Sequence, residues 1–277
     1  MKRIICPIDF SETSLLAVQY ATEIADFHGA QLTIIHAVHL PALEGNKVPL
    51  SERVQKNNWI EQENSTMEVV EAIDTKFKRR GSFASVDYEV KEGLLVDIIV
   101  NMEKKGGIDL IVMGTLGASG LGDYLIGSNT SRVVKKVKSP VLLVPFESTC
   151  KRLNKIVYGS NLDESEISAI KEVVNFAKKQ KAMLKIVHIG NPNSKIVENR
   201  LAEFEEFVKK NVSYERMSMH IEFNKDEFIG LNKFLKREKA DLLAIHNRKR
   251  NFISKLFDSS LADEFIFHSD VPVLCLN

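Results

Sequence analysis

The amino-acid sequence predicts two copies of one α/β domain, each with a parallel β-sheet that helices cover on both faces. Two observations support this fold class: the chain repeats itself, and each copy alternates short apolar strands with amphipathic helices. A chain of 277 residues also suits two domains of about 140 residues, because each is then long enough to bury its own core.

The internal repeat is visible in two pairs of segments. The segment 3–12 (RIICPIDFSE) aligns with 155–164 (KIVYGSNLDE), and 108–114 (IDLIVMG) aligns with 240–246 (ADLLAIH). The second copy is shorter because it has no counterpart of 40–59, which is therefore an excursion of the first copy.

The repeat sets the expected domain boundaries. We expect a first domain over residues 1–146 and a second over 154–277, joined by a linker at 146–154. Trp59, the single tryptophan, lies in the excursion of the first domain and either packs over a site or anchors a helix.

The first copy opens with a short apolar run at 4–8, which is typical of a buried strand. A Ser/Thr-rich start (FSETS) and apolar side chains at three- and four-residue steps over 15–25 predict the helix that follows. Gly29 ends this helix where a C-cap glycine is expected, and the apolar run 31–38 predicts the second strand.

The remaining elements continue the alternation. Apolar side chains at three- and four-residue steps over 67–77 predict a long helix. After this helix along the chain we expect a strand at 85–90, a helix at 94–105 and a strand at 108–114. A glycine-rich segment, a further helix and a final strand at 140–145 follow. Parallel sheets of this kind bind ligands beyond the carboxyl ends of their strands, where the strand order reverses.

Composition excludes several classes of protein. Hydrophobic residues make up 44% and charged residues 27%, and the net charge of +1 provides no global field toward nucleic acid or a membrane. Cys6, Cys150 and Cys275 form neither a metal-ligand spacing nor an even disulfide framework, which indicates a reducing compartment. No apolar stretch suits a signal peptide or a transmembrane helix. We expect a cytoplasmic protein that binds neither nucleic acid nor membrane and has no metal site of its own.

The glycine-rich segment is the strongest candidate for a binding site. Gly114, Gly117 and Gly127 follow a strand and precede a helix at the spacing G-x2-G-x9-G-S. Glycine lets an anion approach the backbone, and the unpaired N–H groups at a helix N-terminus suit a phosphate. Ser128 either caps the helix or donates to a phosphate oxygen. The alternative is a flexible glycine loop without a ligand, but the position between strand and helix favours phosphate binding.

Two further polar residues lie near strand ends. Asp9 follows the first strand, where it either caps the next helix or accepts hydrogen bonds from ribose hydroxyls. His36 recurs as His188 inside an apolar strand, so a hydrogen-bonded core histidine is favoured over a catalytic base.

These motifs resemble the universal stress protein family in its tandem, ATP-binding form. The resemblance rests on the glycine spacing after IVMG, on PIDFSE after the first strand and on IIHAV at the second, and it covers the whole chain. It implies a doubly wound, Rossmann-like domain of the adenine nucleotide α-hydrolase type, with a five-stranded, mainly parallel sheet. It also implies a site for ATP, with or without Mg²⁺.

The resemblance assigns roles to individual residues. It places Asp9 near the nucleoside, with the ribose role favoured over capping, and the backbone of Ala37 at the adenine edge. Glycines line the ribose and phosphates, and the start of the following helix holds the phosphates. The expected binding residues are Asp9, Ala37, Met113, Gly114, Gly117, Gly127, Ser128 and Asn129.

The second copy departs from this pattern. Asn161 stands in place of Asp9, and the three glycines of the motif are replaced by His246, Lys249 and Ser259. Side chains now stand where backbone would have to approach phosphate. We therefore expect the domain 154–277 to be degenerate and not to bind ATP in the family's manner.

Signatures of other enzymes are absent from the sequence. There is no P-loop, no dinucleotide fingerprint, no nucleophile elbow and no evident general base beside the phosphates. We name no catalytic residue and expect a nucleotide-binding stress or regulatory module with at most slow ATP hydrolysis. A weak ATPase and a scaffold without nucleotide are the alternatives.

The expected partners are an adenine nucleotide and an unidentified protein. The family resemblance implies that the last strand pairs across a dimer, and an unpaired apolar edge strand is a liability. We therefore expect the two halves to pack as an internal pseudo-dimer. Whether the chain also forms a homodimer stays open.

Overall fold

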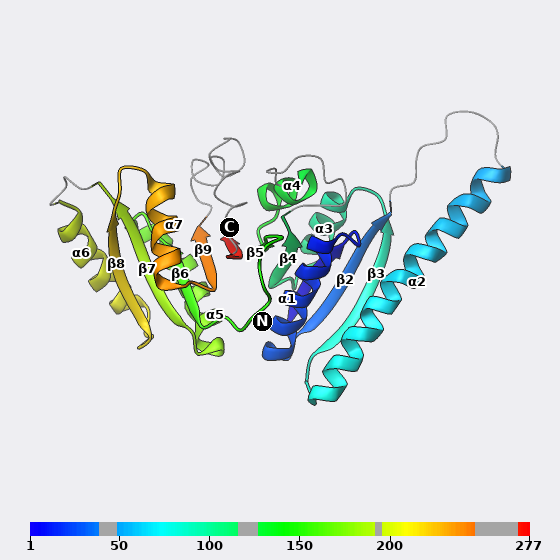
Figure 1. Ribbon diagram of the computed structural model, residues 1–277, viewed down its shortest axis with the longest axis horizontal. Helices are drawn as coiled ribbons and strands as arrows, with labels where there is room; N and C mark the ends of the chain where they lie inside the picture. The colour runs from blue at the N-terminus through cyan, green and yellow to red at the C-terminus, as the bar shows by residue number, and fades with distance from the viewer. Residues whose placement is uncertain (39–48, 116–126, 192–195, 247–270) are drawn as a thin grey trace. The chain divides into compact units, whose positions relative to one another are not determined.

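The computed structural model describes residues 1–38, 49–115, 127–191, 196–246 and 271–277 (Figure 1). The chain divides into two compact units, the first comprising the described residues up to Val141 and the second those from Leu142 on. Within the described ranges, no helix is both long enough and apolar enough to cross a membrane.

The first unit alternates strands with helices. Its elements are β1 (Arg3–Ile8), α1 (Glu12–His28), β2 (Gln31–Val38), α2 (Pro49–Arg80), β3 (Ser85–Glu92), α3 (Leu95–Lys104), β4 (Leu110–Gly114) and α4 (Ser128–Lys136), and β5 (Val141–Val144) begins at its last residue. The strands pair in parallel in the order β3-β2-β1-β4. Beside β4, the amide of Ile111 donates to the carbonyl of Pro140 at 2.9 Å, just before β5.

Helices lie on both faces of this sheet. Crossovers between parallel strands are right-handed, so α1 and α2 cover one face and α3 and α4, which pack against each other, cover the other. Figure 1 shows α1 in front of the central strands and α2 along β3. As predicted, α1 ends at Gly29, which adopts the left-handed conformation (φ 60°). The helix α2 begins at Pro49, well before the 67–77 pattern that predicted it.

The second unit repeats this order. Its elements are β6 (Lys155–Gly159), the short 3-10 helix η1 (Glu164–Glu166), α5 (Ile167–Gln180), β7 (Met183–Gly190), α6 (Ile196–Asn211), β8 (Met217–Phe223), α7 (Glu227–Glu238), β9 (Leu242–His246) and β10 (Val273–Leu276). Its strands pair in parallel in the order β10-β9-β6-β7-β8. The predicted fold class, a repeated doubly wound α/β unit with a parallel sheet, is therefore confirmed.

In each unit an aspartate directly before one central strand bonds to the backbone at the start of the neighbouring central strand, linking β4 to β1 and β9 to β6. In the first unit, the carboxylate of Asp109 accepts hydrogen bonds from the amides of Lys2 (2.5 Å) and Arg3 (3.0 Å). In the second unit, Asp241 accepts in the same way from the amides of Asn154 and Lys155, both at 2.9 Å. Each carboxylate thus satisfies two backbone donors where a central strand begins, and it sets that strand against its neighbour.

We predict that Asp241→Ala lowers the free energy of unfolding by about 2–3 kcal/mol, because it leaves two backbone amides without their acceptor. Asp241 is only 8% exposed, so water replaces the carboxylate poorly. Urea unfolding followed by circular dichroism measures the loss.

The matched control is Asp74→Ala, which removes an exposed i,i+4 ion pair with Lys78 on α2. Its expected loss is below about 0.5 kcal/mol. Equal losses in the two variants would contradict a special role for the aspartate at the start of β6.

Candidate functional site

The carboxyl ends of β1, β2 and β4 meet at one edge of the first sheet, where the predicted site residues gather. Asp9 follows β1, Ala37 lies in β2, Gly114 ends β4, and α4 begins after Gly127. Gly117 lies outside the described residues. The predicted residues that the topology brings to this edge are Asp9, Ala37, Met113, Gly114, Gly127, Ser128 and Asn129.

The turn between β1 and α1 is built on polar side chains. The exposed Asp9 accepts hydrogen bonds from the amide (3.1 Å) and the hydroxyl (2.5 Å) of Ser11 through Oδ1. Ser11 is the N-cap of α1, and its side chain accepts from the amide of Ser14. The alternative in which Asp9 itself caps α1 is therefore wrong, because Ser11 is the N-cap. Asp9 holds that capping residue in place and is itself exposed.

A histidine ties β2 to the end of β1. The Nδ1 atom of His36 lies 2.8 Å from the carbonyl oxygen of Ile8, and the ring of Phe10 packs against it with centroids 5.0 Å apart. In the second unit, Nδ1 of His188 lies 2.8 Å from the carbonyl oxygen of Ser160. His36 is buried, so the prediction of a hydrogen-bonded core histidine is confirmed.

Ala37 contributes its side chain to the core and leaves only its backbone for a ligand. Its methyl group packs against a buried cluster formed by Ile5, Ile35, Ile98 and Met102. In the β1–β2 register, Ile8 lies opposite His36, so Ala37 is one residue beyond the end of β1.

Gly114 is required by packing within the protein. A Cβ at this position would lie 2.9 Å from both the carbonyl carbon and the carbonyl oxygen of Thr13 in α1. We expected the glycine to leave room for ribose or phosphate, but the backbone of α1 occupies that direction. The packing of α1 against β4 is therefore by itself a sufficient reason for a glycine at this position.

Two hydrogen bonds hold the start of α4 beside the end of β4. The amide of Gly127 donates to the carbonyl of Thr115 at 2.7 Å, and the hydroxyl of Thr130 donates to the carbonyl of Gly114 at 3.0 Å. The position of this helix N-terminus is thus set by two carbonyls at the end of β4, one bonded to the N-cap amide and the other to the Thr130 side chain of α4 itself.

The first turn of α4 has neither a capping side chain nor an acidic residue. The N-cap is Gly127, in an extended conformation (φ −52°, ψ 137°), so the alternative in which Ser128 caps the helix is wrong. Ser128 is instead the first helical residue, and both it and Asn129 are exposed. The amides and the positive end of the helix dipole therefore face this edge without a side-chain anion of their own in the described part of the chain.

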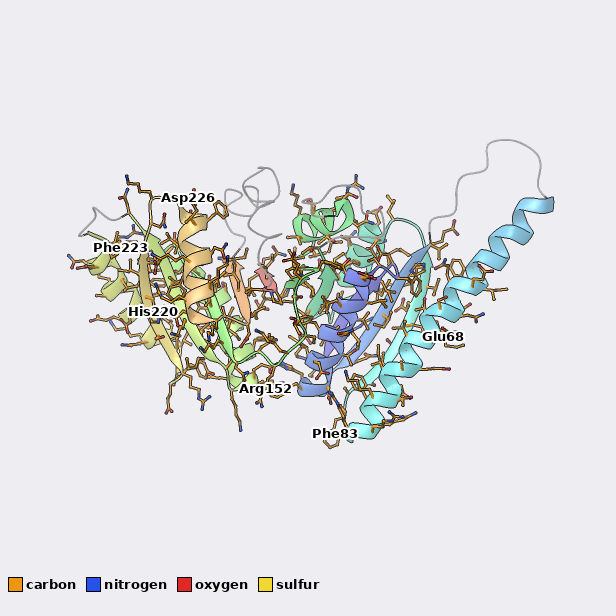
Figure 2. The ribbon with its side chains drawn as sticks, viewed as in Figure 1. Glu68, Phe83, Arg152, His220, Phe223 and Asp226 are labelled. Carbon is orange, nitrogen blue, oxygen red and sulfur yellow. The ribbon has the colours of Figure 1, made fainter. Side chains whose placement is uncertain are left out.

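The helices α1 and α7 supply such a cap themselves. At the start of α7, marked by Asp226 in Figure 2, the Asp226 carboxylate accepts from the amide of Ile229 at 2.9 Å, and Glu227 follows in the first turn. Unlike these two helices, α4 has no side-chain acceptor at its start, and such a start can accommodate an external anion.

The corresponding edge of the second unit is acidic. A small cavity there is lined by residues that include Ser160, Asn161, Glu166, Glu227 and His246. Buried Glu166 accepts from the hydroxyl of Ser160 (2.6 Å) and the amide of Asn161 (3.0 Å).

In the repeat, Glu166 stands where the first unit has Ser14. Burial raises the pKa of the neighbouring Tyr158 hydroxyl, and the negative charge of Glu166 raises it further. A fixed carboxylate thus stands at the edge of the second sheet, and it would repel a phosphate.

Two residues of the first site were not singled out in the sequence. The backbone of Thr13 leaves no room for a side chain at position 114, and the local sequence pattern did not indicate this contact. Thr115 is buried directly beside the start of α4. The sequence signal that could have identified Thr115 is its place between Gly114 and Gly117, two glycines of the motif.

Across the described ranges, no group of three or more His, Cys, Asp or Glu side chains is placed to hold a metal ion.

Two doubly wound units in one chain, the first with a glycine-capped helix at its carboxyl edge, define a tandem Rossmann-like protein. The chain belongs to the universal stress protein family, whose model matches residues 1–145 and again residues 153–277.

Individual relatives agree with this membership. A universal stress protein of Methanocaldococcus jannaschii is 33% identical over 149 residues, which cover 52% of this chain and 81% of the relative. The crystal structure of a universal stress protein from Archaeoglobus fulgidus is 19% identical and covers 99% of this chain and 96% of that chain, with a TM-score of 0.70. A putative universal stress protein from Pseudomonas aeruginosa covers 100% of this chain and 93% of that chain at 15% identity, with a TM-score of 0.59. These structures show the two-unit fold.

We predict that Gly114→Ala destabilises the protein by about 1–3 kcal/mol, because the new methyl group forces β4 and α1 apart. Thermal and urea unfolding measure the loss. The matched control is Gly159→Ala at the end of β6, where a Cβ would meet only Ile245 Cγ2 at 3.7 Å and Leu231 Cδ2 at 4.0 Å. Comparable stability of the two variants would contradict the packing role of Gly114.

Proposed function

We propose that residues 1–146 form an ATP-binding domain and that the protein is a nucleotide-dependent stress or regulatory module. The observation that carries this proposal is the start of α4. It lies at the carboxyl edge of the sheet, is held there by hydrogen bonds to the carbonyls of Gly114 and Thr115, and has a glycine cap and no acidic residue in its first turn.

The start of α4 suits the phosphates of the nucleotide. Its first amides and the positive end of its dipole favour an anion, and the exposed Ser128 and Asn129 add a hydroxyl and an amide within the same turn. Where Mg²⁺ accompanies ATP, phosphate oxygens are its expected ligands, with few or none from the protein.

The ends of β1 and β2 suit the nucleoside. The Asp9 carboxylate is exposed and accepts hydrogen bonds, which is what ribose hydroxyls require. The backbone of Ala37, one residue beyond the end of β1, offers polar groups to an adenine edge. Met113 precedes Gly114 at the end of β4 and is almost fully buried. We therefore expect it to pack beneath the nucleotide and not to bond to it.

We expect hydrolysis at this site to be slow at most. Nδ1 of His36 is engaged with the carbonyl of Ile8, and Asp9 already accepts two hydrogen bonds from Ser11. Neither residue is arranged as a general base toward a terminal phosphate, so binding is the proposed activity.

The second unit is proposed to bind no nucleotide in this manner. Glu166 places a buried carboxylate at the equivalent edge and uses the hydroxyl of Ser160 and the amide of Asn161 as its own donors. The predicted replacements at Lys249 and Ser259 lie outside the described residues. The cytoplasmic location, the packing of the two halves, a homodimer and a protein partner also stay predictions.

We predict that the purified, denatured protein releases an adenine nucleotide and that calorimetry finds one ATP site per chain. Mass analysis identifies the nucleotide, and the titration gives the stoichiometry. A protein that carries no nucleotide and binds no ATP would be a scaffold of the same fold, and the proposed function would be wrong. Fast, saturable phosphate release would instead identify an ATPase.

We further predict that Ser128→Glu weakens ATP binding about tenfold or more, because a carboxylate then occupies the start of α4 and repels phosphate. Its melting temperature should not fall, since an acidic residue in the first turn favours the helix. The control is Ser65→Glu, which adds the same charge to an exposed position of α2. An unchanged ATP affinity in Ser128→Glu would show that the start of α4 does not bind the phosphates.

A further inference from the structure

Thr115 carries a buried hydroxyl without a partner, immediately after β4. The residue is 1% exposed, and its Oγ1 atom has no hydrogen-bond partner in the described structure. A buried hydroxyl without a partner destabilises the folded protein, so each native instance calls for a physical reason.

The backbone of Thr115 lies beside the start of α4. Its carbonyl accepts from the amide of Gly127 at 2.7 Å, and the preceding carbonyl, of Gly114, accepts from the hydroxyl of Thr130. Thr115 is thus adjacent to the helix turn in which neither a capping side chain nor an acidic residue is present.

The contacts of Thr115 and of Gly114 show which residue adjoins the start of α4. A Cβ at Gly114 would meet the backbone of Thr13, so α1 fills the space beside that residue. Thr115 is the first residue after β4, and its carbonyl accepts directly from the amide of Gly127, the N-cap of α4. The buried hydroxyl of Thr115 therefore belongs to the residue that adjoins the helix turn without an anion.

We propose that Thr115 is a phosphate-binding residue of the first unit, with its hydroxyl donating to a phosphate oxygen held at the start of α4. The inference rests on the proposed function and adds to it a side chain that the glycine motif does not include. A phosphate oxygen supplies the acceptor that the hydroxyl lacks, and a hydrogen bond to a charged group is among the stronger ones in proteins.

The chain offers a matched control for this proposal. Thr33, in β2, is also 1% exposed, and its Oγ1 atom likewise has no partner in the described residues. It lies opposite Ile5 in the β1–β2 register, away from the strand ends. Replacing either threonine by valine removes the same buried hydroxyl, but only Thr115 neighbours α4.

The test measures ATP affinity by calorimetry in the full chain and in the variants Thr115→Val, Thr115→Ser and Thr33→Val. Thr115→Val should bind ATP about tenfold more weakly or worse. Thr115→Ser, which keeps the hydroxyl, and Thr33→Val should bind like the wild type. Neither valine variant should melt at a lower temperature, because each removes a polar group that has no partner.

Three outcomes would overturn the inference. Wild-type affinity in Thr115→Val, while the unmodified protein binds ATP, shows that the hydroxyl does not contact phosphate. An equal loss in Thr115→Ser shows that shape, and not the hydroxyl, matters at this position. If the unmodified protein binds no ATP, the proposed function fails and the inference fails with it, which separates that case from the other two.

Discussion

The close approach of α1 to the end of β4 is the contact on which the candidate site depends. The backbone of Thr13 lies where any side chain at Gly114 would begin, so the strand and helix meet with nothing between them. From this fixed point the carbonyls of Gly114 and Thr115 accept the two hydrogen bonds that place α4. A glycine that the sequence associates with a ligand thus acts within the protein, at the contact beside which the start of α4 is held.

The second unit keeps the supports of the fold and changes the chemistry of the edge. Asp241 fastens β6 as Asp109 fastens β1, and His188 bonds a carbonyl at the end of the first strand as His36 does. At the same edge, however, buried Glu166 accepts the local donors itself. The aspartate and histidine hydrogen bonds lie at the strands, whereas the polar residues of the edge lie in the turns that follow them. The residues in the turns can therefore change while the fold is kept.

Much of the fold could be predicted because its signals are local or repeated. The alternation of apolar runs and periodic helices gave the fold class, and Gly29 marked the end of α1. The sequence did not show where α2 begins, since the pattern of its first turns is weak, nor that Gly127 and not Ser128 caps α4. The packing role of Gly114 and the unsatisfied hydroxyl of Thr115 depend on contacts between distant segments, which no local pattern contains.

The hydrogen bonds of His36 and His188 have a consequence for the tautomer of each ring. A backbone carbonyl only accepts hydrogen bonds, so Nδ1 of His36 and of His188 must carry a proton in these contacts. The fold thus determines which ring nitrogen of each imidazole is the donor. In each unit a side chain as well as the backbone ladder joins the second strand to the end of the first.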